Sequence, residues 1–171
     1  MVIEIRTEKS EDCAAIQRIN EAAFGGSKEA NLVEMLRQAD KVCLSLVAIQ
    51  HGQPVGHILF SPVTIADTRE DFPAIGLAPL AVLPAFQRMG IGSKLVRQGL
   101  LDCKREGYRV VVVLGDPHYY ARFGFLRASD HQLDNEYHAY EAFMALELQD
   151  GALQEVRGLV KYAPEFRAAG C

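Results

Sequence analysis

The stretch LAVLPAFQRMGIGSKL, from Leu80 to Leu95, combines a strand, a glycine-containing loop and the start of a helix. An apolar run leads to Pro84, the loop carries Gly90 and Gly92, and an amphipathic segment follows. This arrangement is a common way to bind phosphate, because loop N–H groups point at the anion and the helix dipole favours negative charge. Glycine suits such a loop because it tolerates unusual φ angles and lets a ligand approach the backbone.

Two well-known nucleotide-binding motifs do not fit this loop. A Walker A loop needs a glycine followed by Lys and then Ser or Thr, whereas here Ser93 precedes Lys94. A dinucleotide fingerprint needs a third small residue three positions after Gly92, where Leu95 stands. The loop therefore predicts a phosphate site of another kind, and a plain strand–turn–helix with packing glycines is the alternative.

Composition and charge are those of an ordinary globular chain. The length of 171 residues favours one domain, since a domain averages about 150 residues, and we expect residues 1–171 to form it. The net charge of −4 argues against a general nucleic-acid binder, which would be basic. No apolar run reaches the roughly 18 residues of a membrane span. The charged N-terminus lacks the apolar core of a signal peptide, so we expect a cytoplasmic protein.

The cysteines do not predict a metal or disulfide framework. They are far apart and contain no C-x-x-C pair. The acidic loop from Asp67 to Asp71 has no metal-like spacing either, so we expect no metal. The cysteines are Cys13, Cys43, Cys103 and Cys171.

Hydrophobic periodicity predicts strands and helices along the whole chain. We expect strands at 2–6, 44–50, 55–66, 72–83, 110–114, 137–148 and 156–162, the last two paired, and helices ending near Phe24, at 29–40 and at 91–106. The first helix is expected to be capped by Thr7 or Ser10. His57 is predicted to be a paired strand histidine rather than a catalytic one. The strand before the loop, the helix after it and the run 110–114 predict a βαβ unit with the loop at the carboxyl end of its first strand.

Two longer motifs resemble those of a known family. Gln87-x-x-Gly90-x-Gly92 resembles the pyrophosphate-binding loop of the GNAT superfamily of N-acetyltransferases, written Q/R-x-x-G-x-G/A. The segment YARFGF from Tyr120 to Phe125 resembles a second GNAT signature, Y-x-x-x-G-F. The strings GLAPLAV, LGDP and YARFGF together look like a bacterial branch of these enzymes. The resemblance follows the element order of the whole chain, although its motifs occupy only residues 80–95 and 115–125.

The resemblance implies a fold and a set of site residues. The fold is the acyl-CoA N-acyltransferase (GNAT) fold, of α+β or α/β class, with a mixed central sheet of about six or seven strands and helices on both faces. In the family the loop amides hold the coenzyme A pyrophosphate and the preceding strand hydrogen-bonds the pantetheine arm. The family's tyrosine often protonates the departing thiolate, and Tyr120 occupies that position. The implied cofactor-binding residues are Leu80, Ala81, Val82, Gln87, Arg88, Met89, Gly90, Ile91, Gly92 and Ser93.

The implied function is N-acetyl transfer from acetyl-CoA to a primary amine of a small molecule, protein or peptide, by direct attack in a ternary complex. A non-catalytic sensor or interaction module that binds CoA or acyl-CoA is the alternative, and transfer of another acyl or aminoacyl group is a third. The general base stays open among Asp116, His118, Glu29 and ordered water. Acceptor choice belongs to the loops at 24–31, 67–73 and 127–140. A homodimer is common in the family.

Overall fold

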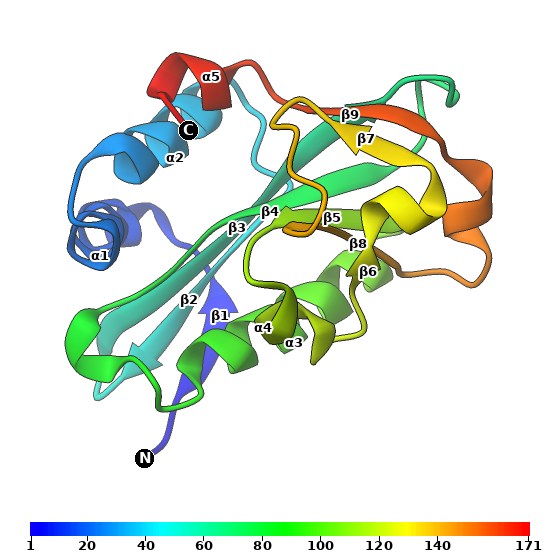
Figure 1. Ribbon diagram of the computed structural model, residues 1–171. Helices are drawn as coiled ribbons and strands as arrows, with labels where there is room; N and C mark the ends of the chain where they lie inside the picture. The colour runs from blue at the N-terminus through cyan, green and yellow to red at the C-terminus, as the bar shows by residue number, and fades with distance from the viewer. The chain divides into compact units, whose positions relative to one another are not determined.

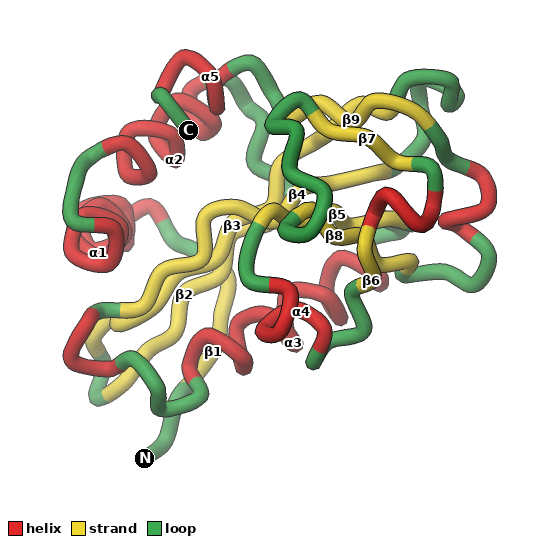
Figure 2. Tube along the Cα trace, viewed as in Figure 1, coloured by secondary structure: helices red, strands yellow, loops and turns green.

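The computed structural model describes residues 1–171 (Figures 1 and 2). The chain divides into two compact units. The first unit contains Met1–Phe60, Ala78–Gly99 and Pro164–Cys171, and the second contains Ser61–Leu77 and Leu100–Ala163. The strands are β1 (Glu4–Thr7), β2 (Leu44–Gln50), β3 (Gln53–Ile65), β4 (Ala74–Val82), β5 (Val110–Leu114), β6 (Leu126–Arg127), β7 (Leu133–Asn135), β8 (Phe143–Glu147) and β9 (Gly158–Tyr162). The helices are α1 (Cys13–Phe24), α2 (Lys28–Gln38), α3 (Ile91–Arg105), α4 (Pro117–Ala121) and α5 (Glu165–Ala169).

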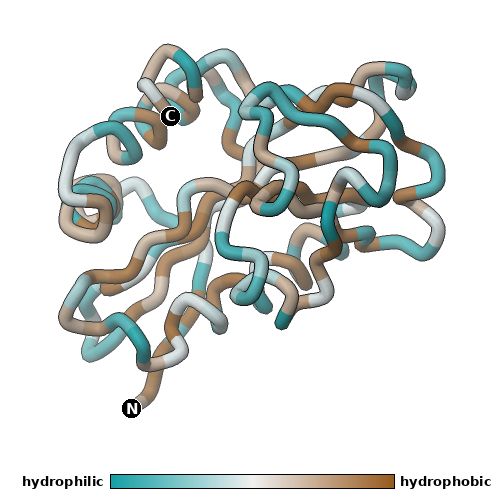
Figure 3. The backbone as a smooth tube through the Cα atoms, viewed as in Figure 1, coloured by the Kyte–Doolittle hydropathy of each residue, from teal (hydrophilic) through white to brown (hydrophobic).

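The first unit contains an antiparallel meander. β1 pairs with β2 from Glu4 opposite Ile49 to Thr7 opposite Leu46, and β2 pairs with β3 across the His51–Gly52 turn. The residue after β4, Leu83, continues the meander by donating its backbone N–H to the Val55 carbonyl at 2.9 Å. The strands of this sheet carry mostly apolar residues (Figure 3), and β2 is buried along most of its length.

Helices cover both faces of the meander. Gly56 of β3 faces α3, since a Cβ at Gly56 would lie 3.0 Å from Leu95 and 3.2 Å from Ile91. Successive strand side chains point to opposite faces, so the neighbouring His57 points away from α3 and meets Asn20 of α1. Helix α1 packs against α2, and α2 packs against the C-terminal α5 (Figure 1). The ion pair of Lys41 with Glu165, at 2.6 Å, reinforces this end of the unit.

The second unit contains the parallel pairing that the sequence predicts. β4 pairs with β5 in parallel, Ala74–Gly76 against Val110–Val112. Because Val110–Val113 are buried on both sides, the run of valines forms a central strand. β5 continues antiparallel to β8, which also pairs with β6. The end of β3 pairs with β9, and β9 pairs with β7 in parallel.

Several sequence expectations need correction. The nine strands exceed the six or seven predicted. The last strand, β9, pairs with β3 and β7 and not with its predecessor, β8, whose partners are β5 and β6. The first helix begins at Cys13 after a 3-10 turn, with Asp12 rather than Thr7 or Ser10 at its N-cap position. Arg6 holds the Asp12 carboxylate at 2.7 Å, and the Lys9 N–H donates to it at 2.7 Å.

The strand predicted from Tyr137 begins only at Phe143 because Asn135 organises the residues before it. The buried Asn135 amide oxygen accepts the N–H groups of Tyr137 at 3.0 Å and Ala139 at 3.1 Å. Its Nδ2 donates to the Ala139 carbonyl at 2.9 Å. These bonds satisfy backbone groups that a strand would otherwise pair, so the chain turns here.

Candidate active site

The predicted phosphate loop, residues 87–93, lies in the first unit, where it joins the end of β4 to the start of α3. A 3-10 turn at Pro84–Phe86 ends at Gln87, and Arg88 and Gly90 then adopt left-handed φ angles of 64° and 82°. The Gly90 carbonyl accepts the N–H of Lys94 at 3.1 Å, which starts α3 at Ile91. A Cβ at Gly90 would meet nothing within 4 Å. Glycine is therefore favoured here by its backbone conformation and not by lack of space.

Consecutive backbone N–H groups of the loop are left unpaired. The N–H groups from Arg88 to Gly92 make no hydrogen bond within the chain. The first N–H groups of a helix have no partner inside the helix, and the positive end of the helix dipole lies beside them. Residues Gln87–Gly90 are exposed, while Ile91 is buried and anchors the helix start. This is the geometry of an anion site.

Gln87 holds the loop against the strand that precedes it. Its Nε2 donates to the carbonyl of Val82, the last residue of β4, at 3.0 Å. The sequence pattern selects Gln87 but does not reveal this contact. Along β4, Ala81 is buried at 2% exposure, whereas Leu80 and Val82 are half-buried.

Tyr120 lies in the second unit, in the short helix α4. Asp116 caps this helix by accepting the N–H of His118 at 2.9 Å, and Pro117 occupies the first helical turn. The Tyr120 ring is buried at 8% exposure. It packs edge-on to Phe125 and lies so close to Gly115 that a Cβ there would come within 2.5 Å of its Cε2.

The electrostatic setting of Tyr120 keeps its proton in place. Burial raises the pKa of Tyr120, and the neighbouring Tyr119 raises this pKa further. The Tyr120 hydroxyl makes no hydrogen bond within the chain. It is therefore protonated at neutral pH and free to donate.

The three side chains considered as general bases are divided between the two units. Asp116 and His118 are exposed at the start of α4 in the second unit. Glu29 is half-buried near the start of α2 in the first unit. Asp116 has a structural explanation as the helix cap. No group of three His, Cys, Asp or Glu side chains could hold a metal ion.

A buried polar cluster explains His57. Its Nε2 lies 2.9 Å from Ser45 Oγ and its Nδ1 lies 3.2 Å from Asn20 Nδ2. An amide nitrogen only donates, so Nδ1 is the acceptor and Nε2 carries the proton toward Ser45. Burial, with the nearby Arg37 charge, lowers the pKa of His57 from 6.5 to about 3. This histidine cannot activate Ser45 as a base, and the predicted paired strand histidine is confirmed.

Comparison with known proteins defines the class of this fold and site. The sequence profile of the family described as "Acetyltransferase (GNAT) domain" matches residues 4–128, which include the phosphate loop and Tyr120. The class is therefore that of the acyltransferases, and the chain belongs to the GNAT acetyltransferase family. No helix combines the length and the apolar character needed to cross a membrane.

Similar proteins include curated and structurally known members of this family. The N-acetyltransferase YhbS of Escherichia coli K12 is 40% identical over 164 residues, which are 95% of this chain and 97% of the relative. The structure of Escherichia coli YhbS in complex with CoA has a TM-score of 0.92 at 38% identity, covering 96% of this chain and 92% of that one. A GNAT acetyltransferase of Brucella melitensis in complex with acetyl-CoA has a TM-score of 0.80 at 39% identity, covering 96% and 98%. The expected GNAT fold is confirmed.

Proposed function

We propose that this protein transfers the acetyl group of acetyl-CoA to a primary amine, of a small molecule, protein or peptide, by direct attack in a ternary complex. The observation that carries the proposal is the run of unpaired N–H groups from Arg88 to Gly92 at the start of α3. Two similar proteins, at 38% and 39% identity, have structures with CoA and acetyl-CoA. Both observations support an acyl-CoA ligand for the loop.

In this proposal the loop and β4 hold the cosubstrate. The unpaired backbone N–H groups from Arg88 to Gly92, in the loop that runs from Gln87 to Ser93, donate to the pyrophosphate, and the exposed Arg88 adds positive charge beside them. Leu80, Ala81 and Val82 offer backbone groups to the pantetheine arm. Acetyl-CoA supplies an activated thioester, and the loop fixes its position before the amine arrives.

Tyr120 is assigned to the leaving group. Negative charge develops on the sulfur as the thioester bond breaks, and a hydroxyl donor there stabilises it and returns a proton. A buried, protonated tyrosine whose hydroxyl has no partner in the chain fits this role. Its raised pKa makes it a weak acid, so donation of a hydrogen bond to the sulfur precedes full proton transfer.

The remaining steps concern the amine and the carbonyl oxygen. The amine must be neutral to attack, so its proton passes to Asp116, His118, Glu29 or ordered water. A backbone N–H near Ala81 or Val82 is the proposed donor to the developing oxyanion.

Substitution of Tyr120 tests both catalysis and the sensor alternative. Thiol release from acetyl-CoA would be measured with a panel of primary amines for the wild type, Tyr120→Phe and the matched control Tyr119→Phe. We expect Tyr120→Phe to lower kcat by about 100-fold to 1,000-fold with unchanged acetyl-CoA affinity by calorimetry, and Tyr119→Phe to stay within about fivefold of the wild type. Equal turnover by wild type and Tyr120→Phe would remove the role of Tyr120. Tight acetyl-CoA binding without turnover of any amine would favour the sensor.

A further inference from the structure

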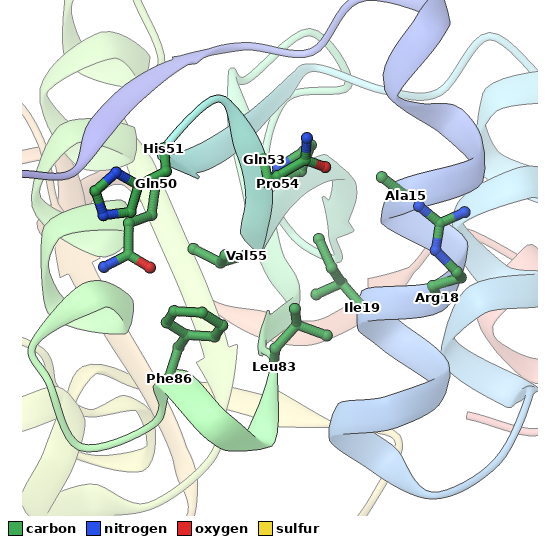
Figure 4. Close-up of a pocket in the computed structure, with 10 residues that line it drawn as sticks. All are labelled: Ala15, Arg18, Ile19, Gln50, His51, Gln53, Pro54, Val55, Leu83 and Phe86. Carbon is green, nitrogen blue, oxygen red and sulfur yellow. The ribbon is translucent and has the colours of Figure 1, made fainter.

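A cavity lies in the first unit, on the α1 side of the hairpin between β2 and β3 (Figure 4). Its volume is about 360 Å³, at the lower end of the range for small-molecule sites. Helix α1 and the hairpin form two walls of this cavity. The segment between β4 and the phosphate loop, with Leu83 and Phe86, forms the third. The cavity is lined by Ala15, Arg18, Ile19, Gln50, His51, Gln53, Pro54, Val55, Leu83 and Phe86.

The floor of the cavity is apolar and held in place by the fold. Ile19 and Val55 are 1% and 3% exposed, and Leu83 and Phe86 are half-buried beside them. The Leu83 N–H donates to the Val55 carbonyl at 2.9 Å, and the Phe86 N–H donates to the Leu83 carbonyl at 2.8 Å. These bonds fix the wall, so a ligand meets a preformed surface and loses little affinity to ordering it.

The rim of the cavity is polar and carries one fixed charge. Figure 4 shows Arg18 on α1 at one side and Gln50 and His51 on the hairpin at the other, with Ile19, Val55 and Leu83 between them. Arg18, Gln50, His51 and Gln53 make no side-chain hydrogen bond or ion pair within the chain.

No acidic residue lines the cavity. One turn along α1 from Arg18, the carboxylate of Glu21 accepts a hydrogen bond from Gln17 at 3.0 Å. The cavity therefore presents an unneutralised guanidinium beside an apolar floor.

From these features we infer that the cavity is a second ligand site, for a small monocarboxylate with a compact apolar body. The Arg18 guanidinium binds the carboxylate, as its planar fork matches that group. The apolar body of the ligand covers the floor of the cavity, and the side-chain amides of Gln50 and Gln53 bind any further polar group. The floor is formed by Ile19, Val55, Leu83 and Phe86. A simple ammonium ligand is disfavoured by the positive rim. This site is separate from the acyl-CoA loop, although Phe86 directly precedes Gln87 in the chain.

Titration of the ¹⁵N-labelled free protein with phenylacetate, monitored by ¹H–¹⁵N NMR, tests the site without acetyl-CoA. Phenylacetamide is the neutral isostere and phenethylamine the cationic one. We expect saturable phenylacetate shifts at the amides of residues 15–19, 50–55 and 83–86. We also expect at least about fivefold weaker binding of the amide, and weaker binding still of the amine.

Two variants test separately how the Arg18 charge and the space above the apolar floor contribute to binding. Arg18→Ala changes an exposed side chain without partners and should lower phenylacetate affinity about fivefold or more. Arg157→Ala, which changes another exposed arginine whose side chain has no partner, is the matched control. Ala15→Phe fills the cavity from the helix surface and should abolish the shifts. Equal affinity for phenylacetate and phenylacetamide, no effect of Arg18→Ala, or shifts confined to other residues would each overturn the inference. None of these outcomes tests the acetyl-CoA loop, because acetyl-CoA binding is measured in a separate titration.

Discussion

Lowering the pH from 7 to 5 is expected to destabilise the folded protein by about 2 kcal/mol through His57 alone. The loss of stability arises because the His57 imidazole becomes protonated in the unfolded chain. His57 is fully buried, its Nδ1 faces the Asn20 amide donor, and its proton lies toward Ser45. A second proton would have to enter at Nδ1 and break the contact with Asn20, in a buried position that also feels the nearby Arg37 charge.

The sign and size follow from the two pKa values. Unfolded, the imidazole titrates near 6.5, while folding lowers its pKa to about 3. Below pH 6.5 the imidazole binds a proton in the unfolded state but not in the folded state. The contribution of His57 to the free energy of unfolding is therefore complete above this pH and is lost as the pH falls. Well inside the range between these two pKa values, each unit by which the pH falls lowers the free energy of unfolding by about 1.4 kcal/mol. Between pH 7 and 5 the unfolded histidine goes from about one-quarter protonated to almost fully protonated, which gives about 2 kcal/mol.

Urea unfolding at pH 7, 6 and 5 provides the assay. With an m-value of about 2 kcal/mol/M, the midpoint should fall by about 1 M between pH 7 and 5. Lowered carboxyl pKa values, such as those of Asp12 and Glu165, act mainly below pH 5 because their ordinary values are 3.8 and 4.5. His57→Gln, which retains hydrogen-bonding capacity, should remove about 2 kcal/mol of this dependence whatever its own stability.

An equal pH dependence of the unfolding free energy in wild type and His57→Gln would show that His57 does not cause the loss of stability. NMR of the folded wild type supplies a measurement that does not depend on the variant. The His57 ring resonances should show the neutral Nε2–H tautomer and should not titrate between pH 7 and 5. Titration of the ring with a midpoint near 6.5 would contradict the assigned environment.

Two further predictions concern the residues that position the site. Gly115→Ala should displace the Tyr120 ring, because the new Cβ would lie 2.5 Å from Cε2, and should lower kcat by about tenfold or more in the thiol-release assay. The exposed Gln154→Ala, outside the loops assigned to acceptor choice, is the control, and equal kcat values for the wild type and Gly115→Ala would contradict the packing argument. Gln87→Ala removes the contact with Val82 and should weaken acetyl-CoA binding about tenfold in calorimetry, with little change in Tm. The exposed Gln154→Ala is the control and should change neither the affinity nor Tm. Unchanged affinity of Gln87→Ala would show that the loop keeps its shape without Gln87.

Local patterns predicted the elements that carry the site. The run Val110–Leu114 and the strand Leu44–Gln50 have the observed bounds, because continuous apolar residues bounded by turn residues leave few alternatives. The start of α3 at Ile91 also follows from the glycine before it. The loop with unpaired N–H groups from Arg88 to Gly92 could be located because its backbone geometry depends on glycine, which is visible in the sequence.

Long-range pairing and side-chain contacts could not be predicted in the same way. β6 and β7 have only two and three residues, too few for a periodic signal. The pairing of β9 with β3 and β7 depends on tertiary contacts, whereas the sequence suggested its neighbour in the chain. The turn built by Asn135, the clamp from Gln87 to Val82 and the cavity beside Arg18 each need three-dimensional positions to be seen.

Isothermal titration of acetyl-CoA into the purified protein tests the central claim that the loop from Gln87 to Ser93 binds the cosubstrate. Gly90→Glu places a carboxylate among the unpaired N–H groups, and Gly25→Glu introduces the same side chain at another left-handed glycine, φ 71°, with open space around it. We expect micromolar binding to the wild type and to Gly25→Glu, and none to Gly90→Glu. Absence of binding to the wild type, or equal binding to Gly90→Glu, would contradict it.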